Sequence, residues 1–394
     1  MKKIALSTLS LALLGAAGAA QAQSSVTLYG TIDTSLTYVH HADSSGQNLW
    51  ALGNASGGDL SGTRWGLKGS EDLGGGLKAI FQLENGFDPS SGKLLQGSRE
   101  FGRQAFVGID GGDKYGTFTL GRQYDPLVDM VQGITADNYF GSVFATAGDV
   151  DNYDNSSRTN NAIKYVSPSF SGLQVEGMYA LGGVAGQTGS GQTWSLAAAY
   201  NNGPISVAAG YFVADNTNGK RTADSNGDGW GGTSGGTFDG SLINLGYQTA
   251  KSINIARIAG QYVAGPFTFG AGYSNSQYKN DGFSTFTSTE KYNTGQGFAN
   301  YQATAALLLG LGYSYTKSSG NTAATYHQIS LGADYNLSKR TDVYLVGAYQ
   351  HASGNTLNAT GTAVVNAEAS VGSYGYSSGN NSQELFALGL RHKF

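Results

Sequence analysis

Segments of about ten residues in which apolar and polar side chains alternate recur along most of this sequence. SVTLYGTIDTSLTY, GLKAIFQLENGF and LLLGLGYSYTK are examples. A period of two predicts β-strands with one apolar and one polar face. After the first 22 residues the longest apolar stretch, ATAALLLGLG at 303–312, has about half of the roughly 20 residues that a membrane-spanning helix needs. If this chain crosses a membrane, it does so with strands.

The connections between these segments are of two kinds. Seven are short: EDLGGG, GGDKY, SPSFSG, NNGP, AGP, the break inside ATAALLL, and SKRT. The other connections are expected to be long and polar, as at 215–240 and 354–383. Outer-membrane barrels have short periplasmic turns and long outer loops. Seven short hairpins and two terminal strands predict an all-β, antiparallel transmembrane β-barrel of 16 strands, in which the first and last strands pair.

The two ends of the chain fit an exported barrel. Residues 1–22 carry Lys2 and Lys3, a short apolar run and a small-residue ending, which predicts a cleaved signal peptide before a barrel of residues 23–394. The chain has no cysteine, so no disulfide stabilises it. It ends on LFALGLRHKF, a strand with one apolar face. We expect this strand to close the barrel against the first one, with Phe394 at the lipid interface.

Several motifs, in order along the chain, resemble the Gram-negative general diffusion porins of beta-proteobacterial type. They are SSVTLYGTIDTSL, RWGLKGSEDLGGGLKAIFQLE, FGRQAFVGI, GTFTLGRQYDP, NNAIKYVSPSFSGL and the terminal GLRHKF. The resemblance implies a homotrimer in the outer membrane of a Gram-negative bacterium, in contact with lipid and lipopolysaccharide. It also implies that the third extracellular loop folds inward, and that the barrel-assembly machinery reads Phe394 as an assembly signal.

Strand periodicity predicts which charges face the lumen, because an Arg or Lys on the lipid face at mid-bilayer costs about 2 to 4 kcal/mol. In the fourth segment Arg103 is expected to lie in phase with Ala105 and Val107, with Phe106 toward lipid. The basic residues expected to line the wall of the pore constriction are Arg64, Lys68, Lys78, Arg103, Arg158 and Lys164.

The porin pattern places an arginine cluster opposite acids of the inward loop. The arginines that match it are Arg64, Arg103 and Arg158, and the loop is 125–155, with a short helix expected in DPLVDMVQGITA. Asp129 and Asp137 match the acidic positions, while Gly133 stands where the family often has a further acid. Opposed charges across a constriction would orient dipolar solutes and set ion preference, with the wall bases favouring anions. The arginines could also neutralise acids of the loop and pin it against the wall, and both roles can hold at once.

The predicted function is a general diffusion channel for small hydrophilic solutes and ions. A substrate-selective channel with aromatic residues down one wall, and a non-conducting surface barrel or adhesin, remain alternatives. Nothing in the sequence indicates an enzyme, a cofactor or a nucleic-acid partner. DSNGDG at 224–229 begins like a calcium loop but has Gly235 where a glutamate is required. The five histidines have no cysteine or carboxylate at ligand spacing, so no metal site is predicted: His40, His41, His327, His351 and His392.

Overall fold

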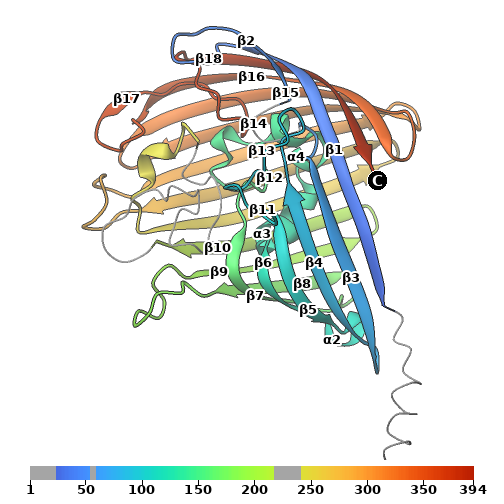
Figure 1. Cartoon of the computed structure of the whole chain (residues 1–394). Helices are drawn as coiled ribbons and strands as arrows, with labels where there is room; N and C mark the ends of the chain where they lie inside the picture. The colour runs from blue at the N-terminus through green and yellow to red at the C-terminus, as the bar shows by residue number, and fades with distance from the viewer. Residues whose placement is uncertain (1–23, 54–58, 217–240) are drawn as a thin grey trace, which may run out of the picture.

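The computed structural model describes residues 24–53, 59–216 and 241–394. They form a closed antiparallel β-barrel with short helical segments inside it (Figure 1). The predicted signal peptide and the calcium-like stretch lie outside the described residues. In the part described, no helix has both the length and the apolar character to cross a membrane.

The barrel wall has sixteen strands, since two of the eighteen in the sheet, β2 (Leu49–Leu52) and β17 (Val364–Asn366), are short additions to β1 and β16. The wall strands are β1 Ser25–His40, β3 Arg64–Gly74, β4 Leu77–Gly86, β5 Gln104–Asp110, β6 Thr117–Gln123, β7 Thr159–Val166, β8 Leu173–Ala180, β9 Thr193–Asn202, β10 Ile205–Asp215, β11 Ser252–Ala264, β12 Phe267–Lys279, β13 Glu290–Gln302, β14 Leu307–Ser319, β15 Ala323–Asn336, β16 Thr341–Leu357 and β18 Ser382–Lys393. Each wall strand pairs with the next, and β18 pairs with β1 from Thr31↔Lys393 to His40↔Glu384. The predicted barrel of 16 strands is confirmed.

The outer face of the wall is apolar. On β18 the side chains of Phe386, Leu388 and Leu390 are exposed, while Leu385 and Ala387, which alternate with them, are buried. This alternation puts the apolar row on the outside, where lipid would meet it. The predicted facing of the terminal strand is therefore confirmed.

All seven short connections occur as predicted, at one end of the barrel. At the other end the prediction that all other connections are long is wrong at one place, because residues 320–322 alone join β14 to β15. The glycine of this turn has a φ of 137°, a conformation that side chains rarely adopt, which allows the tight reversal. The connections at the long-loop end of the barrel therefore differ in length.

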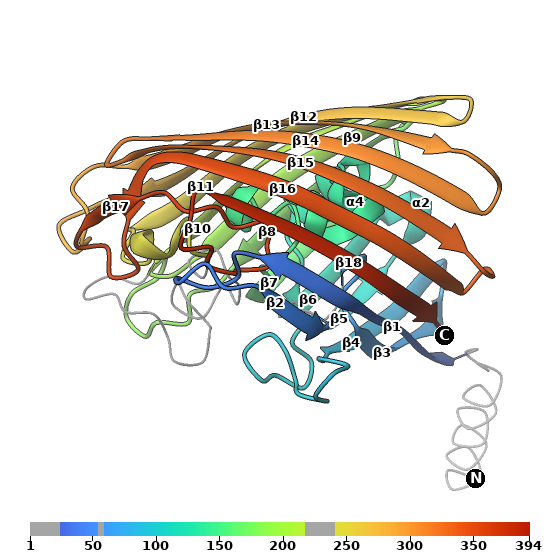
Figure 2. The ribbon, with the colours of Figure 1, turned by 90° about the horizontal axis from the view of Figure 1, so that it is seen from above.

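Strand lengths also differ from the expected ten residues. β5 to β8 have seven or eight residues, whereas β11 to β16 have thirteen to seventeen (Figure 2). β13 begins at Glu290, seven residues before the segment that the alternation indicates. Its first residues pair with β12 but carry polar side chains on both faces, so the apolar–polar alternation does not mark them. β5 begins only at Gln104, since the preceding residues form a loop in which Gln96 and Ser98 have positive φ.

The connection between β6 and β7 lies inside the barrel (Figure 1). It contains α3 (Pro126–Val131), η1 (Gln132–Ile134), α4 (Asp137–Phe140), η2 (Gly141–Phe144) and η3 (Ala147–Asp149). Asp125 begins α3 as an N-cap, its side chain accepting a hydrogen bond of 2.8 Å from the Leu127 amide, and Pro126 occupies the first helical position. The helix α3 packs against β9 and β10. Within the ranges that the structure describes, the remaining helical segments are α2 (Gly112–Tyr115), in a short turn, and η5 (Leu245–Tyr247).

Candidate functional site

Three of the predicted arginines meet around one tyrosine and one glutamate. Arg103 donates from Nε to Glu84 Oε1 at 2.8 Å and from Nη2 to the Tyr124 hydroxyl at 2.7 Å. Arg158 Nη2 donates to the same hydroxyl at 2.9 Å. Arg64 Nε lies 3.6 Å from Glu84 Oε2. We call this group, Arg64, Glu84, Arg103, Tyr124 and Arg158, the arginine cluster.

Strand pairing explains why residues so far apart in the sequence meet here. Glu84 on β4 pairs with Gly66 on β3 and with Gln104 on β5, which places it beside Arg64 and Arg103. Tyr124 follows the end of β6, and Arg158 precedes the start of β7. The cluster therefore lies at the level where the inward loop leaves and rejoins the wall.

A fourth arginine, Arg122, lies at the same level and was missed by the sequence analysis. It donates from Nε to the Gly102 carbonyl at 2.8 Å and from Nη1 to Asn160 Oδ1 at 2.5 Å. Strict alternation puts Arg122 in phase with Leu120, which is exposed on the outer face. The β6–β7 pairing shifts register between Gly121 and Gln123, where the extra residue of a β-bulge lies on β7. The alternation of β6 is therefore unbroken, and Gln123 shares a face with Thr119, whose hydroxyl donates to it at 2.6 Å. Arg122 is buried nevertheless, because its hydrogen bonds join it to the loop before β5 and to β7.

Lys68 and Lys78 are not brought into the arginine cluster. Lys68 is exposed and lies over the Tyr29 ring, 5.2 Å from its centroid. Lys78 stands opposite Asp72 of β3 and Asp110 of β5 in the strand register, beside the short turns. It is six residues along β4 from Glu84, about 20 Å at 3.3 Å per residue.

Lys164 and Asp129, expected on opposite sides of a constriction, contact each other directly. Their side chains form an ion pair, and Lys164 Nζ also lies 3.1 Å from Glu176 Oε1. The ammonium group donates a further hydrogen bond of 3.1 Å to the Tyr124 carbonyl. This pair fastens α3 to β7, so the structure favours loop anchoring for these two residues.

Asp137 is buried inside the loop and does not contact the arginine cluster. Its carboxylate accepts hydrogen bonds from Gln132 Nε2 at 2.9 Å and Thr135 Oγ1 at 2.6 Å. Burial, with a smaller effect from Asp154, raises the pKa of Asp137 to about 7. Part of the acidic charge expected across the pore is therefore neutral near neutral pH.

The expected facing of the fourth segment is wrong. Val107 is exposed on the outer face, while Phe106 pairs with Gln82 and shares its inward side. Arg103 still reaches the lumen side because it precedes β5 and does not follow its alternation. The chain reverses phase at the junction between loop and strand, which a period-two pattern cannot show.

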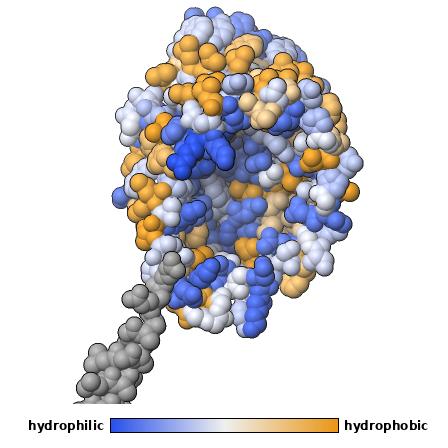
Figure 3. All heavy atoms as spheres, turned by 90° about the vertical axis from the view of Figure 1, so that its right-hand side faces the viewer, coloured by the Kyte–Doolittle hydropathy of each residue, from blue (hydrophilic) through white to orange (hydrophobic). Residues whose placement is uncertain are grey.

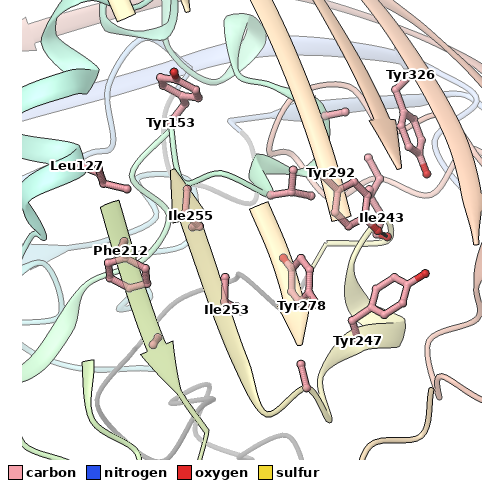
Figure 4. Close-up of a cluster of buried hydrophobic side chains, with 14 of the residues drawn as sticks. Leu127, Tyr153, Phe212, Ile243, Tyr247, Ile253, Ile255, Tyr278, Tyr292 and Tyr326 are labelled. Atoms are coloured by element: carbon pink, nitrogen blue, oxygen red, sulfur yellow. Dashed lines mark hydrogen bonds between the residues drawn. The ribbon is translucent and has the colours of Figure 1, made fainter. Parts of the chain in front are cut away.

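A buried arginine on the opposite wall, Arg257 of β11, also escaped the sequence analysis. Its Nη1 donates to the Asn152 carbonyl at 2.9 Å, and its guanidinium lies 3.6 Å from the centroid of the Tyr153 ring. Tyr153 belongs to the inward loop and lies at the edge of the buried cluster shown in Figure 4. Arg257 therefore holds the returning part of the loop.

Aromatic side chains gather inside the barrel but are covered. Tyr278 and Tyr292 pack against Tyr247 of η5, with ring centroids 5.7 and 6.3 Å away (Figure 4). All three side chains are buried. Within the described residues these tyrosines make a core, and they do not form an exposed aromatic lane for a selected substrate.

One end of the barrel is visibly hollow. Figure 3, which views the end carrying the short turns, shows a depression lined mainly by hydrophilic residues, with hydrophobic patches on the surface around it. A polar interior with an apolar exterior is the arrangement of a water-filled barrel.

The histidines have no carboxylate at ligand spacing in the sequence, but the fold brings a carboxylate to one of them. His40 Nδ1 lies 2.6 Å from Glu384 Oε2, because the two residues face each other across the β1–β18 pair. They are separated by 344 positions in sequence, so no local spacing could reveal the contact.

Comparisons with known proteins agree with the fold. Residues 7–355 match the family model described as Gram-negative porin. An outer membrane porin protein of Bordetella pertussis is 31% identical over 89% of this chain and 94% of its own length. Outer membrane porin protein 32 of Delftia acidovorans is also 31% identical, over 87% and 88% of the two chains.

Among solved structures, an anion-selective porin from Comamonas acidovorans superimposes with a TM-score of 0.70 and 25% identity, covering 94% of this chain and all of the other. OmpT of Vibrio cholerae, at 17% identity and a TM-score of 0.62, shares the fold. The barrel, its inward loop and these matches lead to one conclusion: the chain belongs to the family of Gram-negative porins.

Proposed function

We propose that this protein is a general diffusion channel of the outer membrane, passing small hydrophilic solutes and ions with a preference for anions. The observation that carries the anion preference is the arginine cluster, in which three guanidinium groups gather around Tyr124 and a single carboxylate, that of Glu84. Family membership and the outer-membrane relatives support the channel itself.

The charge imbalance explains the preference. Asp129 is paired with Lys164, and Asp137 is buried in the loop with a raised pKa, so neither offsets the arginines. Arg64 is the most solvent-accessible of the three clustered arginines, with 27% of its side chain exposed. A fixed positive charge beside a narrow water-filled passage lowers the free energy of anions there and raises that of cations. Solutes cross by diffusion, without a chemical step.

Replacing two of these arginines tests the proposal. In planar bilayers under a salt gradient, Arg64→Ala combined with Arg103→Ala leaves Glu84 without its two ion-pair partners, and we expect the zero-current potential to shift toward cations. Lys78→Ala removes one positive charge about 20 Å along the wall and is the control, with an expected shift much smaller than half of that in the double variant. An unchanged potential in the double variant would refute the role of the cluster.

The resemblance also suggests partners and processing, which we propose here as further properties. Three copies are expected to assemble, which closures of conductance in thirds would show. Contact with lipopolysaccharide and with the barrel-assembly machinery is expected from the outer-membrane location. Residues 1–22 are expected to be removed on export, so that sequencing of the mature protein would begin at Gln23.

A further inference from the structure

Two histidines and a glutamate come together where the first and last strands of the barrel meet. His40 ends β1, His41 follows it, and Glu384 lies near the start of β18. One possible ligand atom from each residue lies within 4.8 Å of the other two. We call these three residues the seam cluster.

The backbone at His41 is what places both imidazoles together. Adjacent residues in a strand point to opposite faces, so His40 and His41 should diverge. His41 instead has a φ of 57°, in the left-handed region that non-glycine residues rarely adopt. The two rings stack with centroids 3.9 Å apart. Both imidazoles are therefore available to the same small volume beside Glu384.

Neighbouring groups already orient the rings as ligands. The Ser382 carbonyl lies 3.0 Å from His41 Nδ1, so that nitrogen donates its proton there and Nε2 keeps the lone pair that a metal needs. A carbonyl on the far nitrogen is the usual support of a metal-bound histidine. Glu384 Oε2 contacts His40 Nδ1 at 2.6 Å, where a metal ion can replace the shared proton.

The position of the seam cluster leaves it accessible from outside the barrel. Glu384 is in phase with Phe386, and His40 is in phase with Tyr38, so both side chains lie on the outer face of the wall. They lie closer to the long loops than the aromatic pair formed by Tyr38 and Trp50. The His40 and Glu384 side chains are 41% and 30% exposed. An ion from the external medium can therefore reach the cluster without entering the pore.

We propose that the seam cluster binds a divalent transition-metal ion of the Zn²⁺ class, with His40, His41 and Glu384 as ligands and water in the fourth position. Two imidazoles and one carboxylate form a ligand set that suits Zn²⁺, whereas Ca²⁺ and Mg²⁺ prefer oxygen ligands alone. Tetrahedral zinc holds its ligand atoms about 3.3 Å apart, so the most distant ligand atoms must close by up to about 1.5 Å, while His40 Nδ1 and Glu384 Oε2 must separate from their present 2.6 Å. The bound ion links β1 to β18 and stabilises the closure of the barrel.

Zinc titration of the refolded full-length barrel tests the proposal. With excess Mg²⁺ present, calorimetry is expected to show one Zn²⁺ bound per chain, with affinity at least tenfold lower in His40→Ala, His41→Ala and Glu384→Gln. His327→Ala is the matched control, because His327 lies on the outer face of β15 with the Tyr313 hydroxyl 2.8 Å from its Nδ1. This variant is expected to bind zinc as the unchanged protein does.

A stability measurement keeps the test decisive if a variant folds poorly. Zn²⁺ should raise the temperature at which the folded barrel converts to the slower-migrating unfolded form on gels, and a chelator should reverse the rise. Glu384→Gln retains the size of the side chain and should fold while losing the effect. Absence of saturable zinc binding, or equal binding by the His40→Ala/His41→Ala double variant, would overturn the proposal.

Discussion

Asp137 shows how a single carboxyl group can make the inward loop sensitive to pH. It is fully enclosed, and its hydrogen bonds to Gln132 and Thr135 only partly offset the loss of hydration. Its pKa of about 7 in the folded protein lies above the usual value of 3.8. The stabilisation of the loop by the protonated form is therefore complete below about pH 4 and is lost as the pH rises through 7.

We predict that the loop is held less firmly at alkaline pH. Hydrogen-exchange protection of residues 132–140, corrected for intrinsic rates, should fall by roughly tenfold or more between pH 5 and 8. Asp137→Asn keeps the shape but cannot ionise, so its protection should vary little over this range. Asp113→Asn, in the exposed α2 turn, should behave like the unchanged protein. An equal pH dependence in Asp137→Asn would show that another group is responsible.

Single-residue facing could be predicted from the sequence only where the alternation is unbroken. Arg64 lies on the first residue of β3 and Lys164 within β7, and both face inward as expected. Phe106 was placed on the wrong face because the phase shifts by one residue where the preceding loop joins β5. Arg122 was missed because it shares the phase of the exposed Leu120, and its burial depends on contacts with the neighbouring loop. The partners of a charge depend on loop geometry, which is why the Lys164–Asp129 contact was not foreseen.

The inward loop is fixed to the wall by shape as well as by charge. Gly310 of β14 and Gly332 of β15 pair with each other and form a slot that the Phe140 ring fills. A Cβ atom at either glycine would overlap that ring. Phe140 itself is completely buried and stacks on Phe144, with centroids 4.9 Å apart.

Filling this slot should release the tip of the loop. We expect Gly310→Ala and Gly332→Ala to displace Phe140 at a cost of about 1 to 3 kcal/mol, the usual range for overpacking. Single-channel recordings should then show a changed conductance and more frequent flickering. Gly295→Ala on β13 is the control, because a Cβ there meets no atom within 4 Å. Recordings indistinguishable from those of the control would mean that Phe140 does not hold the loop.

For the strands, the sequence predicted their number more reliably than the residues at which each begins and ends. The sixteen strands follow from alternation and from the seven short turns. The starts of β5 and β13 were misplaced, since polar residues continue the pairing of β13 beyond the membrane band while a loop replaces the beginning of β5. The three-residue connection after β14 was missed because its length depends on how far the two strands extend, which composition does not reveal.

For the whole molecule, closure depends on a seam between residues at opposite ends of the chain. Sixteen strands, an even number, bring β1 and β18 together antiparallel, which removes the exposed sheet edges. Arg391 of β18 supports the neighbouring pair by binding Asp342 at 3.1 Å and Asp334 at 3.3 Å. The sequence predicts that these ends meet, but the side-chain contacts across the seam arise only when the ring is closed.

The terminal residue lies at the end of this seam. The backbone N–H and carbonyl of Phe394 each form a hydrogen bond of 3.0 Å with Gly30, and the ring covers that glycine so closely that a Cβ would overlap it. Phe394→Ala keeps both backbone bonds and removes only the ring. If the ring is an assembly signal, the amount of folded barrel in the outer membrane should fall several-fold while refolding in detergent micelles stays nearly unchanged.

These two measurements separate recognition of Phe394 from its packing. Phe386→Ala, which removes a ring from the same face of β18, is the control and should leave the cellular yield largely intact. Gly30→Ala should displace the Phe394 ring without changing the C-terminal sequence. Because an assembly factor would read the strand before the seam closes, this variant should keep its early recognition but weaken the finished barrel. Equal losses of Phe394→Ala in cells and in micelles would assign the ring to seam packing alone.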